Sequence, residues 1–194
     1  MMRERRRSWM LVVAASAMIV GAASCQQGSG PAAGPTFGAG KVARAGVAEI
    51  SRSDLPKGGA RGVQYVPVYS HVYTDDAARP FNVAVTLAVR NTDPAAPRFL
   101  ASVAYFDSDG KLVREYAPGP LRVAPMAVAE FFVPQNDTAG GSSASFLVTW
   151  SAEADGAEPP MVEAVMVGTA TNQVVSFTNQ GRPVAVPAEG ASRP

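Results

Sequence analysis

The stretch RFLASVAYFDSDGKLVREY, residues 98–116, constrains the fold of this 194-residue chain more than any other. Its first arm alternates large and small side chains over at least eight residues, which predicts an extended strand. Residues 107–111 then predict a tight turn, because Asp107 can accept hydrogen bonds from following backbone amides and Gly110 can adopt a positive φ. Two strands joined in this way form an antiparallel hairpin. The side chains expected on one face of its first strand are Phe99, Ala101, Val103 and Tyr105.

Strand patterns recur on both sides of this hairpin. The plainest is residues 81–91, where Val or Leu occupies every second position from Val83 to Val89. Further strands are expected at residues 64–73, 121–123, 126–133, 144–152, 161–169 and 174–177. Turn residues separate them, and no helical period of comparable length follows residue 24. We therefore expect an all-β domain over residues 62–183, an antiparallel two-sheet sandwich of immunoglobulin-like type.

The beginning of the chain has the pattern of a secretory signal peptide, predicted over residues 1–24. Arginines at positions 3 and 5–7 precede an apolar run from Trp9 to Val20. A run of this length is too short for a spanning helix, which needs ~20 residues. Ala22-Ala23-Ser24-Cys25 resembles a bacterial lipobox, in which the cysteine is lipidated and becomes the new N-terminus. The alternative is an ordinary signal peptide with a chance cysteine.

A lipid on Cys25 would anchor the exported chain to a bacterial membrane, on the periplasmic side. Gln26 after the cysteine is typical of lipoproteins sorted to the outer membrane, and the choice between inner and outer membrane stays open. Cys25 is the only cysteine in the sequence, so no disulfide can form within one chain. Stability must then come from core burial.

Segments poor in large apolar residues flank the expected domain. Residues 25–61 are rich in Gly, Ala, Pro and Ser, which predicts a flexible tether between membrane and domain. Residues 184–194 are expected to form a disordered tail. The sequence thus predicts a signal peptide, a tether, one sandwich domain and a tail.

The charge of the mature chain argues against nucleic acid as a partner. Removal of residues 1–24 takes four arginines and Glu4 from totals of 17 Lys and Arg and 16 Asp and Glu, leaving 13 against 15 and a net charge of −2. Phosphate binding requires clustered cations. The basic residues of the domain instead stand singly: Arg79, Arg90, Arg98, Lys111, Arg114 and Arg122.

Several blocks of the domain resemble a known bacterial family. They are YVPVYSHVY at 65–73, VRNTDP at 89–94, YFDSDGKLV at 105–113, EFFV at 130–133, DTAGG at 137–141, FLVTW at 146–150 and EAVMVG at 163–168. In this order they resemble predicted exported lipoproteins built on a domain of unknown function. The resemblance covers nearly the whole domain and implies an exported, anchored β domain, with no activity or cofactor attached to it.

No catalytic constellation emerges from the residues themselves. His71 is the only histidine, and a hydrolase triad of His71 with Asp137 and Ser142 or Ser143 lacks the G-x-S-x-G elbow. Serines in a Gly-rich loop are ordinary turn residues. We therefore expect no enzyme activity and no catalytic residue.

Acidic pairs offer no better case for catalysis. The acids Glu153, Asp155 and Glu158 lie in an expected loop with Gly156 and Pro159, where solvated carboxylates are normal.

Two parts of the sequence partly resemble metal sites. Asp107-x-Asp109-Gly110 resembles the middle of an EF-hand loop, but tyrosines stand at its first and closing ligand positions, which favours a hairpin turn. A copper site could combine His71 with methionines. The candidates Met126, Met161 and Met166 lie in apolar strand patterns and are better interpreted as core residues. No metal or other cofactor is expected.

The first expected strand carries the most suggestive surface. In an extended strand Tyr69, His71 and Tyr73 share one face, a flat platform suited to stacking on a sugar ring or a partner's aromatic side chain. The alternative is that these rings cap the core. With Asp137, Gly140 and Gly141 of the following loop, they form the candidate binding face.

Two functional hypotheses follow. The first is a non-catalytic binding or assembly module of the bacterial cell envelope that meets an envelope protein or wall glycan. The second is a small-ligand or metal-binding protein that uses His71.

Overall fold

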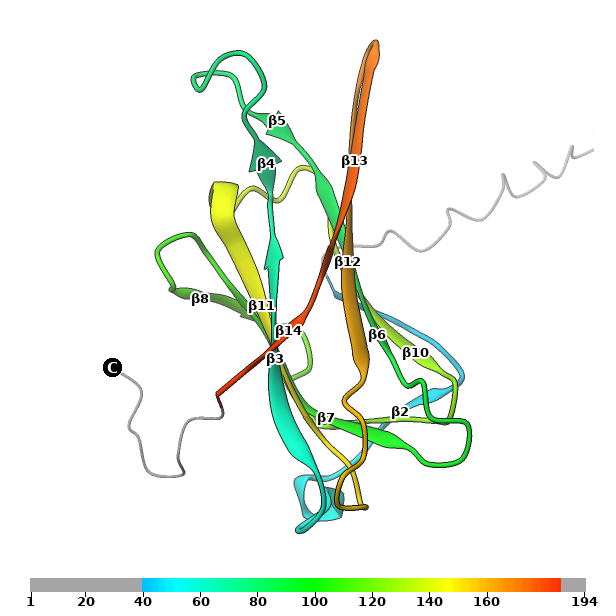
Figure 1. Ribbon diagram of the computed structural model, residues 1–194. Helices are drawn as coiled ribbons and strands as arrows, with labels where there is room; N and C mark the ends of the chain where they lie inside the picture. The colour runs from blue at the N-terminus through cyan, green and yellow to red at the C-terminus, as the bar shows by residue number, and fades with distance from the viewer. Residues whose placement is uncertain (1–39, 186–194) are drawn as a thin grey trace, which may run out of the picture. The chain divides into compact units, whose positions relative to one another are not determined.

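The computed structural model describes residues 40–185, which form an all-β domain with fourteen strands in this part of the chain (Figure 1). Neither of the two short 3-10 helices between residues 40 and 185 is long and apolar enough to cross a membrane. The predicted signal peptide, Cys25 with the first part of the predicted tether, and residues 186–194 lie outside the described residues. The strands are β1 Gly40–Val42, β2 Val47–Glu49, β3 Arg61–Val68, β4 His71–Val72, β5 Phe81–Asn82, β6 Ala84–Arg90, β7 Arg98–Phe106, β8 Leu112–Glu115, β9 Leu121–Val123, β10 Val128–Val133, β11 Ala144–Ser151, β12 Met161–Ala170, β13 Gln173–Gln180 and β14 Arg182–Val184; the 3-10 helices are η1 Arg52–Asp54 and η2 Gly141–Ser143.

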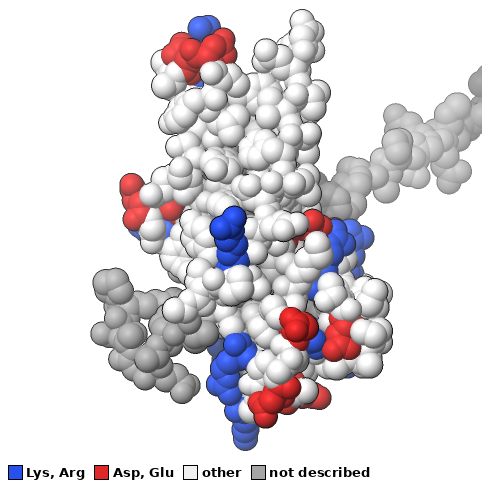
Figure 2. All heavy atoms as spheres, viewed as in Figure 1, with Lys and Arg blue, Asp and Glu red and all other residues white. Residues whose placement is uncertain are grey.

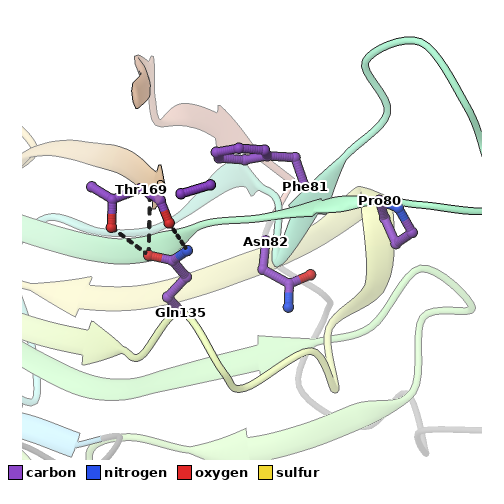
Figure 3. A pocket seen from close by; sticks show the side chains of 6 residues that line it. Pro80, Phe81, Asn82, Gln135 and Thr169 are labelled. Atoms are coloured by element: carbon purple, nitrogen blue, oxygen red, sulfur yellow. Dashed lines mark hydrogen bonds between the residues drawn. The ribbon is translucent and has the colours of Figure 1, made fainter. Parts of the chain in front are cut away.

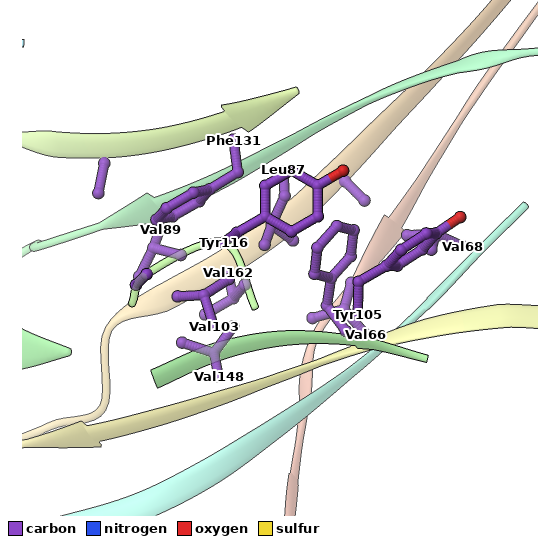
Figure 4. Packing of buried hydrophobic residues seen from close by; sticks show 14 of the residues in the cluster. Val66, Val68, Leu87, Val89, Val103, Tyr105, Tyr116, Phe131, Val148 and Val162 are labelled. Atoms are coloured by element: carbon purple, nitrogen blue, oxygen red, sulfur yellow. The ribbon is translucent and has the colours of Figure 1, made fainter. Parts of the chain in front are cut away.

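The strands form two main antiparallel sheets and one small hairpin. The first sheet has the order β1-β10-β6-β12-β13. The second has the order β14-β3-β11-β7-β9-β2, with β8 paired to β7, and β4 and β5 form the hairpin. Side chains from both sheets meet between them, among them Leu87 and Phe131 from the first sheet and Val66 and Tyr105 from the second (Figure 4). The expected antiparallel two-sheet sandwich is confirmed.

The predicted hairpin is formed by β7 and β8. Asp107 accepts hydrogen bonds from the backbone N–H groups of Asp109 (3.0 Å) and Lys111 (2.8 Å), and Gly110 has a φ of 77°. The prediction that Phe99, Ala101, Val103 and Tyr105 share one face of this strand is wrong for Ala101 and the residues before it. The pairing with β11 passes from Ser102 to Leu100 and skips Ala101, so a bulge places Leu100 with Val103 and Tyr105 in the core.

Residues 40–60 differ from the expected flexible tether. β1 pairs with β10 at the margin of the first sheet, and β2 pairs with β9 at the margin of the second. A Gly- and Ala-rich segment cannot build a core of its own, but it can add short strands to sheets that already exist. Val47 also packs partly buried against the core.

The chain crosses directly between the sheets near its end. β13 belongs to the first sheet and β14 to the second, with only Gly181 between them. A Cβ at Gly181 would lie 3.1 Å from Val162 Cβ and 3.2 Å from Val66 Cγ2, so the crossing packs closely against both sheets. β14 covers residues 63–65 of β3.

Candidate functional site

The candidate face lies where β3 leads into the β4–β5 hairpin. The expected continuous strand over residues 64–73 is interrupted, since β3 ends at Val68 and β4 begins at His71. Ser70 leaves the sheet ladder because its N–H donates to Gly141 O (2.9 Å) and its carbonyl accepts from Val83 N (2.9 Å). The interruption leaves Tyr69 at the β3–β4 junction and His71 in a separate short strand.

The three aromatic residues therefore do not form one flat platform. Tyr69 packs against the core, with its ring edge-on to Phe177 at 5.6 Å between centroids. His71 and Tyr73 form a separate edge-on pair, also at 5.6 Å. Tyr73 is the most open of these residues, with 55% of its surface exposed. The role of the three as a binding face stays a prediction.

The loop that carries Asp137, Gly140 and Gly141 is held against the same end of the domain. Asp137 accepts hydrogen bonds from Ala139 N (3.2 Å) and from Arg114 Nη1 on β8 (3.1 Å). The carbonyl of Gly140 accepts from the Ser108 N–H (3.1 Å), and Gly141 adopts a φ of 76°. Together with the Ser70–Gly141 bond, these contacts bring the loop next to the β3–β4 junction, as the candidate face requires.

A buried hydroxyl pair lies behind this loop. Tyr105 and Ser70 share a hydrogen bond of 2.8 Å between their hydroxyl oxygens, and neither residue has exposed surface. Burial raises the pKa of Tyr105 to about 12, although the Ser70 hydrogen bond acts in the opposite direction. Tyr105 therefore remains a protonated phenol at neutral pH.

A second phenol connects this core to the surface. Tyr116 stacks edge-on against Tyr105 at 6.1 Å, and its hydroxyl accepts a hydrogen bond from Arg114 Nη1 (3.0 Å). Burial also raises the pKa of Tyr116, against the Arg114 hydrogen bond, which lowers it. Arg114 thus joins Tyr116 to Asp137. The sequence shows Tyr116 and Arg114 but gives no local signal that they meet Asp137, 23 residues away from Arg114.

A shallow pocket of about 240 Å³ opens beside the β4–β5 hairpin (Figure 3). Phe81 and Asn82 of β5 line one side, and Gln135 lies across from them. The Gln135 amide is held by Thr169, whose carbonyl accepts from Nε2 (2.9 Å) and whose N–H donates to Oε1 (3.3 Å). The lining is uncharged and does not include His71, which is the strand partner of Asn82.

Charged side chains are sparse over this end of the molecule. In Figure 2 the upper third of the visible face shows no Lys, Arg, Asp or Glu apart from a cluster at the tip. That tip is the β4–β5 loop, where Asp76 and Arg79 form an ion pair (3.1 Å). The β12–β13 hairpin rises beside it and ends in exposed residues such as Val174, 71% exposed.

The catalytic and metal hypotheses gain no support from the contacts between residues 40 and 185. Asp137 bonds to Arg114 and Ala139, and none of its hydrogen bonds reaches His71. No group of three or more His, Cys, Asp or Glu residues in this part of the chain could hold a metal ion.

The methionines proposed as partners of His71 do not gather around it. Met166 is fully buried in the core, whereas Met126 and Met161 are exposed. Met161 pairs with Arg90 at one end of β6, and His71 pairs with Asn82 just before the other end. Seven residues of strand correspond to roughly 23 Å, which is too far for a shared metal.

These features define a small antiparallel β-sandwich domain with one end that carries few charges outside the β4–β5 loop. The chain belongs to the family described as Protein of unknown function (DUF3124), which matches residues 61–184. This confirms the resemblance to a family built on a domain of unknown function, and β1 and β2 lie before the matched residues. No curated protein and no solved structure gives a significant match to the chain.

Proposed function

We propose that this protein is a non-catalytic binding or assembly module of the bacterial cell envelope, anchored to the membrane by a lipid on Cys25. The observation that carries the binding role is the end formed by the β4–β5 and β12–β13 hairpins, where Tyr73 is 55% and Val174 is 71% exposed and the β12–β13 hairpin carries no charge from Ala164 to Gln180. Exposed aromatic and apolar side chains that lie together are typical of surfaces that contact another macromolecule. The partner is an envelope protein or wall glycan.

Photo-cross-linking in living cells tests this role. A benzophenone amino acid replaces Tyr73 in the full chain, and in a matched control it replaces Leu112, a 45% exposed residue on β8. The proposal expects discrete adducts from position 73 that are absent from position 112. Adducts with isolated wall sacculi would identify a glycan, and discrete protein bands would identify an envelope protein. The same adduct pattern from both positions would contradict the proposal.

The lipid anchor has a separate test. Cys25→Ser removes the thiol that the lipobox presents for acylation, so incorporation of labelled palmitate should be lost. Ser24→Ala keeps the thiol and a small residue before it, and should retain the label. Labelling of Cys25→Ser would refute the anchor without affecting the binding role.

A second candidate function rests on the pocket beside β5. Its neutral lining, with the Phe81 ring and the Asn82 amide, suits a small uncharged polar ligand such as a sugar. Thermal unfolding with wall sugars would reveal such a ligand, and the same measurement with divalent metals and copper tests the metal alternative. A ligand at 100 times its dissociation constant adds ~2.7 kcal/mol of stability. If the site uses His71, then His71→Ala abolishes the shift, and an unchanged shift contradicts a role for that residue.

An immunoglobulin-like relationship is also part of the proposal. Its support is the pairing of four central strands: β6 pairs with β10 in one sheet and β7 with β11 in the other. The consecutive strands β6–β7 and β10–β11 each cross between sheets, as strands B–C and E–F do in immunoglobulin domains. The outer strands differ in order, because β3 lies beside β11 and β12 beside β6. An experimental structure with other pairings of the four strands would contradict this relationship.

A further inference from the structure

β13 is an outer strand of unusual character. It has eight residues, QVVSFTNQ, without charge or proline, and the charge-free run extends from Ala164 to Gly181. The other strands at the margins of the main sheets, β1, β2 and β14, have three residues each and carry Lys41, Glu49 and the pair Arg182-Pro183 respectively. Short length, charge and proline are the usual protections of a sheet edge against pairing with another chain. β13 has none of them.

The hydrogen-bond register shows which groups β13 leaves free. The hairpin pairs Ala170 with Gln173 across a two-residue loop, and the Gly181 N–H donates to Val162 O (2.7 Å) at the other end. In an antiparallel ladder the residues between these points alternate, so odd-numbered residues of β13 bond to β12. The N–H and C=O groups of Val174, Ser176 and Thr178 therefore point away from the sheet. All three residues are exposed.

We propose that β13 pairs with β13 of a second copy of this chain, antiparallel and about a two-fold axis through Ser176. This register places Val174 opposite Thr178 of the second copy, and it joins the outward groups of all three residues in one ladder. It also places Val175 opposite Phe177, a β-branched and aromatic pair that stabilises antiparallel strands. The two five-stranded sheets then form one continuous sheet.

The lack of charge in β13 and the length of the strand favour a second copy of this chain as the pairing partner. A two-fold axis through Ser176 sets this side chain beside its own counterpart, and it sets the other residues of the strand within a few positions of theirs, so like charges in the strand would repel one another. β13 has no such residue. A second copy also brings a strand of equal length with outward groups at matching positions. The inference goes beyond the proposed envelope function and does not depend on the lipid anchor.

The test introduces charge at the centre of the pairing. Sedimentation velocity is measured on the full chain in a mild nonionic detergent, with reductant so that Cys25 cannot link copies, over about 1–100 μM. The native chain should dimerise. Ser176→Lys and Ser176→Glu should each weaken dimerisation on the order of 10-fold or more, because like charges meet at the axis. A 1:1 mixture of the two variants should recover the dimer, since Lys then faces Glu.

The control Leu112→Lys adds the same charge on β8, at a side chain that is also exposed, and should dimerise like the native chain. Circular dichroism establishes that each variant is folded. A native chain that stays monomeric throughout this range overturns the proposal. Dimers that persist in Ser176→Lys, or a mixture that fails to recover, overturn it as well, because self-association would then use another surface.

Discussion

Gly140 is buried in a space that has no room for a side chain. A Cβ at this position would overlap the Tyr105 hydroxyl oxygen and lie 2.7 Å from Ala144 Cβ. Gly140→Ala must therefore displace the loop or the tyrosine, and we expect a loss of about 3 kcal/mol in the free energy of unfolding, measured in urea. Gly119→Ala is the control, because nothing lies within 4 Å of its Cβ. Equal stability of both variants would show that the loop is not packed on Tyr105.

The Ser70–Tyr105 hydroxyl pair should behave as one unit. Either Ser70→Ala or Tyr105→Phe leaves the other hydroxyl buried without its partner, and each should cost about 1–3 kcal/mol. The double variant should cost less than the sum of the two, with a coupling of about 1 kcal/mol in a double-mutant cycle. Strict additivity would mean that the bond contributes nothing of its own.

Tyr105 also predicts how stability responds to alkaline pH. Its pKa is raised from 10.0 to about 12 by burial, so between these values the folded chain keeps a proton that the unfolded chain releases. The contribution is present below pH 10 and is lost as the pH rises toward 12, by roughly 2–3 kcal/mol. The free energy of unfolding, measured with a chemical denaturant from pH 9 to 12, should decline less steeply with pH in Tyr105→Phe than in the native chain. Parallel curves would contradict the assignment.

At the scale of elements, the β12–β13 hairpin extends past its neighbour. β12 pairs with β6 as far as Val167, and its last residues have β13 alone as a strand partner. Gln135 replaces the missing strand by bonding to both backbone groups of Thr169. Gln135→Ala should therefore speed hydrogen exchange at Thr169 and nearby amides by about 5- to 10-fold, with little change in the melting temperature. Gln173→Ala, in the same hairpin, should leave exchange at Thr169 unchanged.

The elements that could be predicted are those with local signals. Asp107 and Gly110 determine the β7–β8 turn within five residues, and alternating Val and Leu determine β6. The break at Ser70 depends on Gly141 and Val83, which are distant in sequence, so no pattern near Ser70 reveals it. The bulge at Ala101 likewise depends on the register with β11.

The candidate site shows the same division. The sequence placed Gly140 and Gly141 in a loop, and it named Tyr69, His71 and Tyr73 as neighbours on one strand. The sequence gives no local signal that the Tyr69 ring packs against Phe177, which lies more than a hundred residues later in the chain. The pocket beside β5 also escaped prediction, because Gln135 and Asn82 come together only through sheet pairing.

At the scale of the whole molecule, residues 40–60 should contribute to stability although the family match begins at residue 61. A chain that begins at residue 61 lacks β1 and β2, and it exposes the margins of β10 and β9 that they cover. We expect its melting temperature to fall by about 5–10 °C relative to a chain that begins at residue 40, measured by calorimetry. Identical melting temperatures would mean that the two strands are attached without stabilising the sandwich.

The attachment of β1 and β2 to different sheets has a mechanical consequence. The chain enters the domain through β1, which is held to the first sheet by three residue pairs, and continues into β2, which is held to the second sheet by three more. A pulling force applied at Gly40 therefore detaches β1 from β10 before it loads β2, and it reaches β3 only after both have yielded. Two short strands in series thus protect the core from tension that arrives along the N-terminal segment.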